Sequence, residues 1–301
     1  MLGKKLIQEA AKKSGGGPPP SSSTAIAIAH ASSPFITAYP WSSSGFGTKF
    51  TNPSTLPIST AYGVDFAPDG SAIAVAHGFW PYVYVYAWSA SGFGTKFSDP
   101  GTLPTGDPYG VTFAPDGNSI VLSHSGSPYV SAYPWSGSGF GTKFSTPASV
   151  VGTGFEGSFT STSNAVSLAL LTTGTNVYAW SGSGFGTQFS QPSTLPGGRT
   201  RGTAFSPDDS TIAFSTEGSP YVAAYPWSGS GFGTKFSDPT TTPTGLGNHI
   251  AFSSGSDAVA IAHSSSPYIT AYPWSGSGFG TKFSNPSTLP AGTGQAVAFT
   301  S

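Results

Sequence analysis

The sequence predicts an all-β protein, a six-bladed β-propeller with four strands in each blade. A motif of the form AYPWSGSGFGTKF recurs around six tryptophans that are 45 or 47 residues apart: Trp41, Trp88, Trp135, Trp180, Trp227 and Trp274. A phenylalanine recurs at a similar interval, displaced so that no copy precedes the first tryptophan: Phe66, Phe113, Phe159, Phe205, Phe252 and Phe299. Six repeats of this length, rich in Gly, Pro and short apolar runs, are typical of propeller blades.

The second repeat shows the expected strands most clearly. Its first strand is followed by Pro-Asp-Gly, a common β-turn sequence, and its third is dense in β-branched and aromatic residues. Within each first strand, bulky and small residues alternate, which predicts that a bulky face of one blade packs on a small face of the next. The four strands are expected at Tyr62–Ala67, Ala72–His77, Tyr82–Trp88 and Phe93–Phe97.

The offset between the tryptophan repeat and the phenylalanine repeat predicts how the ring closes. The N-terminal part supplies only the second, third and fourth strands of the first blade, beginning at Thr24. The C-terminal segment Gln295–Ser301 is expected to supply its first strand by pairing with Thr24–His30. Residues 24–301 then form the propeller, without the open edge that a linear array of sheets would leave.

Composition excludes several function classes. Only 8% of the residues are charged and the formal net charge is −1, so we expect no nucleic-acid partner. The chain has no cysteine, which excludes thiolate metal sites and disulfides. No apolar run reaches transmembrane length, so we expect no membrane insertion. The N-terminus does not match a secretory signal.

Residues 1–13 predict an amphipathic helix, followed by a Gly/Pro/Ser linker at 14–23. Leu2, Leu6 and Ile7 gather on one side of this helix, away from its lysines. A helix of about 12 residues is marginal alone in water, which indicates a segment that docks on another protein. A frayed tail and binding to a membrane surface are the alternatives.

Parts of the sequence resemble known families. The run FAPDGNSIVLSH, followed by SPYVSAYPWS, resembles WD-repeat and related propellers, although a Ser follows the Trp and the Gly-His pair is missing. The repeated SPY[IV]xAYPWSGSGFGTKFS segments are similar to propellers encoded by tailed phages, and MLGKKLIQEAAKK is similar to N-terminal segments of their virion appendage proteins. This resemblance implies a virion protein, assembled in the host cytoplasm and extracellular as part of the particle.

Repeated polar residues have structural explanations. Four histidines at one repeat position, His30, His77, His124 and His263, lie on separate blades, so we expect each to bond the adjacent turn and none to hold a metal. The lysine repeated in the fourth strand protects the sheet edge. Asp69, Asp116 and Asp208 form turns.

No catalytic constellation is expected, because Glu156, Arg201 and His249 occur one per blade and unpaired near the starts of first strands. We predict that the protein is not an enzyme and has no cofactor.

Contrast between repeats predicts a ligand-binding face. The loops that join the second to the third strand and the fourth strand to the next blade vary, and both open on one face of the ring. Aromatic and charged residues collect there, and aromatic rings stack on sugars. The alternative for Trp80 is that it covers the neighbouring blade. The predicted face comprises Trp80, Tyr62, Tyr109, Phe155, Glu156, Arg201 and His249.

Together these features predict a non-enzymatic phage virion protein, an appendage or decoration of the tail or head. Its N-terminal helix is expected to dock on a capsid or tail protein, and its propeller to contact a host-surface glycan. The alternatives are a free-standing lectin-like or protein-binding propeller and a lactonase-like hydrolase. A designed consensus propeller is also open, although the divergent fourth blade argues against it.

Overall fold

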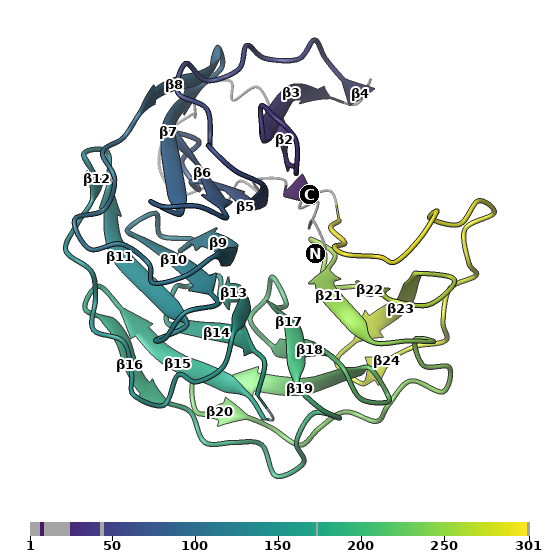
Figure 1. Cartoon of the computed structure of the whole chain (residues 1–301). Helices are drawn as coiled ribbons and strands as arrows, with labels where there is room; N and C mark the ends of the chain where they lie inside the picture. The colour runs from purple at the N-terminus through teal and green to yellow at the C-terminus, as the bar shows by residue number, and fades with distance from the viewer. Residues whose placement is uncertain (1–6, 9–24, 43–44, 173, 300–301) are drawn as a thin grey trace. The chain divides into compact units, whose positions relative to one another are not determined.

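The computed structural model describes residues 7–8, 25–42, 45–172 and 174–299, which form six four-stranded sheets (Figure 1). Each sheet is an antiparallel meander in which consecutive strands are neighbours. The described residues contain no α-helix, and thus none long and apolar enough to cross a membrane. This arrangement confirms the predicted all-β class and is consistent with a six-bladed β-propeller.

The chain divides into two compact units, residues 1–146 and residues 147–300. Each unit holds three sheets. The sheets of the first unit are β1 (Ile7–Gln8), β2 (Ala25–Ala29), β3 (Ile36–Ser42) and β4 (Gly45–Phe46); β5 (Ala61–Phe66), β6 (Ala72–His77), β7 (Val83–Ser89) and β8 (Gly92–Lys96); and β9 (Pro108–Phe113), β10 (Ser119–His124), β11 (Val130–Ser136) and β12 (Gly139–Phe140).

The second unit repeats the pattern. Its sheets are β13 (Gly154–Phe159), β14 (Ala165–Leu170), β15 (Asn176–Ser181) and β16 (Gly184–Gln188); β17 (Thr200–Phe205), β18 (Thr211–Thr216), β19 (Val222–Ser228) and β20 (Gly231–Phe232); and β21 (Gly247–Phe252), β22 (Ala258–His263), β23 (Ile269–Ser275) and β24 (Gly278–Phe279). Each strand predicted for the second repeat begins and ends within one residue of the corresponding strand among β5–β8.

Within each unit the core lies between adjacent sheets. Alanines of β2 and β3 pack against Val64, Phe66 and Trp88 of the second sheet. Alanines of β6 in turn face Val111 and Phe113 of the third sheet. A small face against a bulky face lets twisted sheets approach closely, as the alternation in the sequence predicts.

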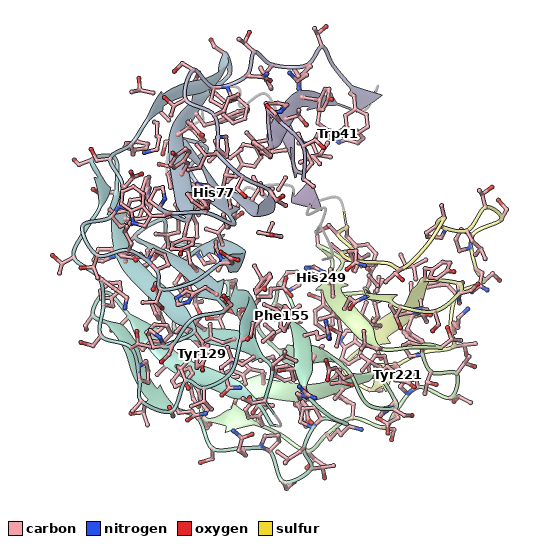
Figure 2. The ribbon with its side chains drawn as sticks, viewed as in Figure 1. Trp41, His77, Tyr129, Phe155, Tyr221 and His249 are labelled. Atoms are coloured by element: carbon pink, nitrogen blue, oxygen red, sulfur yellow. The ribbon has the colours of Figure 1, made fainter. Side chains whose placement is uncertain are left out.

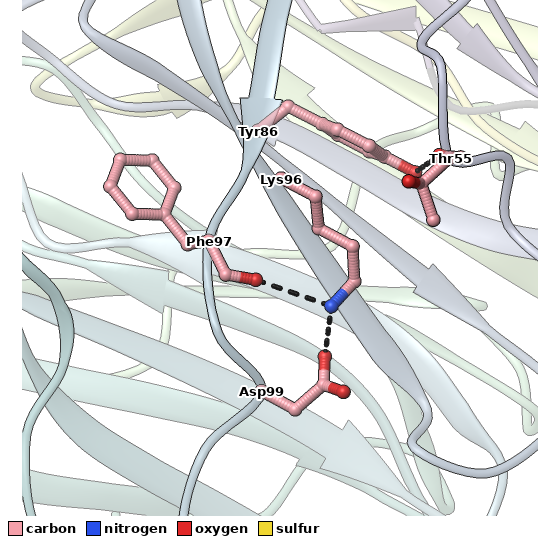
Figure 3. Close-up of polar contacts among 5 residues, drawn as sticks. All are labelled: Thr55, Tyr86, Lys96, Phe97 and Asp99. Carbon is pink, nitrogen blue, oxygen red and sulfur yellow. Dashed lines mark hydrogen bonds and ion pairs between the residues drawn. The ribbon is translucent and has the colours of Figure 1, made fainter.

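Aromatic residues connect successive sheets at fixed positions. In the first unit, Phe50 packs edge-on against Trp88 of the next sheet, with ring centroids 5.2 Å apart. The fully buried Tyr86 donates its hydroxyl hydrogen bond to the Thr55 carbonyl, at 2.8 Å (Figure 3). Tyr225 donates in the same way to the Thr194 carbonyl in the second unit, at 2.9 Å. These contacts explain why the Tyr-x-Trp pattern of the third strand recurs.

The first sheet differs from the prediction in its first strand. Ile7 and Gln8, expected in a helix, form β1 and pair with Ile28 and Ala27 of β2. An exposed strand edge presents unpaired N–H and C=O groups, which any neighbouring extended segment can satisfy. The β-branched Ile7 suits a strand, and so short a helix has little stability of its own. The rest of the predicted helix and the linker lie outside the described residues.

The C-terminal segment 294–299 carries no assigned strand, and the position beside β2 that it was expected to fill is taken by β1. The pairing of Gln295–Ser301 with Thr24–His30 stays a prediction. The segment nevertheless lies against the sixth sheet as a first strand would. Gly294 N donates to the His263 carbonyl at 3.0 Å, as Ala61 N donates to the His30 carbonyl at 3.2 Å between the first two sheets.

Candidate functional site

The loop between the second and third strands has the same backbone in the second and third sheets. His77 N donates to the Tyr82 carbonyl, and His124 N to the Tyr129 carbonyl, both at 2.9 Å. A cis peptide bond precedes each proline of these turns, and both tyrosines have positive φ, 76° and 69°. The first, fifth and sixth sheets share this geometry, with Tyr221 in the fifth (Figure 2). We call this loop the Pro turn.

The Pro turn of the second sheet carries side chains that the others lack. Phe79 and Trp80 stand where the third sheet has Gly126 and Ser127. Phe79 is 62% exposed and Trp80 is 61% exposed, so neither is buried against a neighbouring sheet. This exposure does not support the alternative that Trp80 covers an adjacent blade. The backbone of the turn does not depend on these two side chains.

A neighbouring loop, which precedes the first strand of each sheet, differs in the same way. In the third sheet Thr105 donates its hydroxyl to the Ser127 carbonyl at 2.6 Å, and Thr244 does the same to Ser266 in the sixth. The equivalent residue in the second sheet is Ile58, which cannot donate and is exposed. Ile58, Phe79 and Trp80 together are called the apolar loop surface below.

Tyr62 and Tyr109 lie at the starts of β5 and β9 and contact each other, with ring centroids 5.7 Å apart. Tyr62 also reaches the Pro turn, because a Cβ added to Gly78 would lie 2.8 Å from its ring. Burial, followed by the charge of Asp107, raises the pKa of Tyr62. The structure thus brings together two of the predicted site residues and places one of them beside the loop that carries Trp80.

In the second unit, Glu156 and His249 meet, although they belong to the fourth and sixth sheets (Figure 2 labels His249). Glu156 Oε1 is 2.6 Å from His249 Nε2, and Glu156 Oε2 accepts from Thr203 N at 3.3 Å. The prediction that these residues stay unpaired is wrong. Gly202 of the intervening β17 makes the contact possible, since a Cβ there would lie 2.9 Å from His249 Cα and 3.2 Å from Glu156 Oε2.

Arg201 is paired as well, with a residue that sequence analysis overlooked. Its Nε and Nη2 bind Glu217 Oε1 at 2.9 and 2.7 Å, and Arg199 Nε lies 3.2 Å from Glu217 Oε2. The Arg201 guanidinium also lies over the Phe155 ring, 5.2 Å from its centroid. Glu217 was detectable in the sequence, because it replaces the serine or glycine that most repeats have after the second strand.

The repeated histidines of the second, third and sixth sheets are buried and separate. His124 Nε2 lies 3.0 Å from Ser131 Oγ, and His263 Nε2 lies 2.9 Å from Thr270 Oγ1. Burial lowers the pKa of His124 to about 4, against the opposing effect of backbone hydrogen bonds at Gly126 and Val130. Among the residues that the structure describes, no group of His, Asp and Glu could hold a metal ion. The imidazoles of His124 and His263 thus bond hydroxyl groups of the third strand, whereas neither ring nitrogen of the buried His77 has a hydrogen-bond partner among the described residues. The prediction that each histidine bonds the adjacent turn is wrong for His77.

The other repeated polar residues also have structural roles. Lys96 pairs with Asp99 and donates to the Phe97 carbonyl at 3.2 Å (Figure 3). Its ammonium group also lies over the Tyr84 ring. Asp69 accepts from Ser71 N at 2.9 Å, and Asp116 and Asp208 make the same contact two residues ahead. These aspartates form turns, as the sequence predicts.

Comparison with known proteins informs the fold only. No family model and no curated protein matches the chain. Among solved structures, Kuenenia stuttgartiensis hydrazine synthase is similar, with a TM-score of 0.62 over 83% of this chain and 73% of that chain. The sequence identity is 13%, too low to carry a function across. The likeness supports the β-propeller-like fold.

Proposed function

We propose that the protein is a non-enzymatic binding propeller of a phage particle, which contacts a host-surface glycan through the apolar loop surface. One observation carries the proposal. Phe79 and Trp80 are more than 60% exposed on a turn whose backbone is shared with turns that have Gly and Ser instead. Packing does not require these rings, and clustered exposed apolar side chains mark interaction sites.

The chemistry of the surface favours a sugar over a charged partner. Rigid aromatic side chains offer a large apolar face at a small cost in conformational entropy. The apolar C–H face of a pyranose ring fits such a surface. No acidic or basic residue occurs in the Pro turn between Gly78 and Tyr82. Tyr62, which contacts Gly78, adds a hydroxyl group beside the turn for hydrogen bonding.

The location on a virion is supported by the similarity of the repeats and of the first 13 residues to phage proteins. In this proposal the N-terminal segment docks on another virion protein, without the continuous helix that β1 contradicts. A truncated protein that starts at Ser21 tests this part. It should fold but fail to join the particle, whereas normal incorporation would place the docking surface elsewhere.

The glycan contact is tested by restoring the residues of the third sheet in the double variant Phe79→Gly and Trp80→Ser. On an array of bacterial surface glycans, the parent should bind and the double variant should lose binding. Val151→Ser is the matched control, because it removes an exposed apolar side chain from another loop. Equal binding by the parent and the double variant would contradict the proposal.

A further inference from the structure

Five charged or titratable residues that do not belong to the repeat lie in the second unit. Arg199 and Arg201 are the only arginines of the chain, and Glu156 and Glu217 are two of its three glutamates. His249 is the one histidine outside the repeated position. These residues lie at or beside the starts of β13, β17 and β21, or in the Pro turn of the fifth sheet. In a chain with 8% charged residues, this concentration needs an explanation.

The two arginines already hold a carboxylate, that of Glu217, and have donors to spare. A guanidinium has five N–H donors arranged to bind carboxylates in pairs. Glu217 engages Nε and Nη2 of Arg201 and Nε of Arg199. No other acidic side chain among the described residues pairs with either arginine. The side chain of Arg199 is 54% exposed, so its remaining donors face solvent.

Closing the loop does not require these charges. Glu217 N donates to the Arg199 carbonyl at 3.0 Å, which joins the Pro turn to the preceding loop. The same backbone bond joins Ser125 to Asp107 and Ser264 to Leu246 in sheets that lack the ion pairs. A purely structural clamp would therefore duplicate a bond that the backbone already makes. The surplus is a cationic surface with net charge +1, from two guanidinium groups and one carboxylate.

We propose that Arg199 and Arg201 bind the carboxylate of an acidic sugar, such as a uronic acid. The exposed donors of Arg199 make the first contact. Arg201 lies beside it, with its guanidinium over the Phe155 ring, 5.2 Å from the ring centroid. This inference rests on the proposal that the protein binds glycans, and it adds to the apolar loop surface a separate site for an acidic sugar.

Titration of the full-length protein with D-glucuronate, with D-glucose as the neutral comparison, tests the site. The parent should bind glucuronate more tightly than glucose. Arg199→Thr, which restores a residue that other repeats have, should weaken glucuronate binding roughly tenfold or more, since hydrogen bonds between charged groups are strong. Lys282→Thr removes the same charge elsewhere in the second unit and should change little.

A second variant separates binding from a structural role. Glu217→Ser restores the serine of the third and sixth sheets and frees the donors that Glu217 engages, so glucuronate should bind more tightly. Unchanged or weaker glucuronate binding in Glu217→Ser, or equal binding by Arg199→Thr and Lys282→Thr, would overturn the inference.

The double variant Phe79→Gly and Trp80→Ser should bind glucuronate like the parent. If it loses glycan binding on the array while Arg199→Thr binds glucuronate normally, the inference fails and the proposed function stands. If it keeps glycan binding while Arg199→Thr loses glucuronate, the proposed apolar contact fails and the acidic-sugar site stands.

Discussion

The Pro turns of the second and third sheets share a backbone and differ in what they present to solvent. In both, the histidine amide donates to the tyrosine carbonyl at 2.9 Å, and the tyrosine amide closes the turn, to Phe79 at 2.7 Å and to Gly126 at 2.6 Å. In the third sheet, Thr105 donates to the carbonyl of Ser127, whose side chain is exposed to solvent. The second sheet shows Ile58, Phe79 and Trp80.

The difference between the two turns distinguishes residues that form the turn from residues that the turn only presents to solvent. The proline and the aromatic residue with positive φ that follows it recur in all five sheets that have this turn. The apolar loop surface occurs once, on a turn that forms equally well without it. Unusual side chains on an unchanged backbone are therefore the best indication of function in a repeat protein.

The largest expected effect is on the pH dependence of folding stability, and it arises from the buried histidines that both turns have. Burial lowers the pKa of His77 and of His124 to about 4. An unfolded histidine binds its proton near pH 6.5. Between pH 6.5 and 4 the unfolded chain thus binds more protons, so folding stability falls as the pH falls, by roughly 3 kcal/mol for each histidine.

Asp65 acts in the opposite direction, because burial raises its pKa to about 7 and its stabilising contribution is lost as the pH rises through that value. The test therefore compares the parent with His124→Thr, which has the fifth sheet's residue at this position. From pH 6.5 to 4, the parent should lose more unfolding free energy than the variant in denaturant titrations. Parallel pH profiles would show that His124 does not titrate in this way.

A smaller loss is expected when the third turn receives the second turn's phenylalanine, in Gly126→Phe. A Cβ at residue 126 would lie 2.7 Å from the Thr105 carbonyl carbon, and this backbone cannot move aside easily. Overpacking of this kind costs about 1–3 kcal/mol. Chemical denaturation should show the loss. An unchanged midpoint would mean that the two loops are less tightly apposed than the structure indicates.

The smallest effect is expected from Ser127→Trp, which copies Trp80 onto the third turn. Ser127 is exposed, so the change in stability should stay within about 0.5 kcal/mol. Thermal unfolding of the variant beside the parent provides the measurement. A marked drop would show that Trp80 needs local packing that the third turn lacks, and it would weaken the functional interpretation.

The sequence predicted the sheets because six repeats indicate the same strand boundaries. A boundary that is ambiguous in one repeat can be assigned from the others. The prediction was wrong at Ile7 and Gln8, which were expected in a helix and instead pair with β2 as a strand. The repeat shows that this edge needs a partner strand. It does not show which of two extended segments supplies it.

The candidate site was predictable in part for a similar reason. Tyr62 and Tyr109 occupy one repeat position on adjacent sheets, so their contact follows from the periodicity. The pair of Glu156 and His249 spans two sheets and depends on the absence of a side chain at Gly202. The position of a residue in the repeat predicts where its backbone lies. The contacts of its side chain also depend on the size of the side chains around it.

The central claim is that Phe79 and Trp80 bind a ligand and do not support the fold. Its most direct test measures the dissociation constant for a glycan that the parent binds, and the melting temperature, on the parent and on the double variant Phe79→Gly and Trp80→Ser. We expect at least a tenfold weaker affinity with a melting temperature within a few degrees of the parent. Unchanged affinity, or a loss of affinity that accompanies unfolding, would contradict the claim.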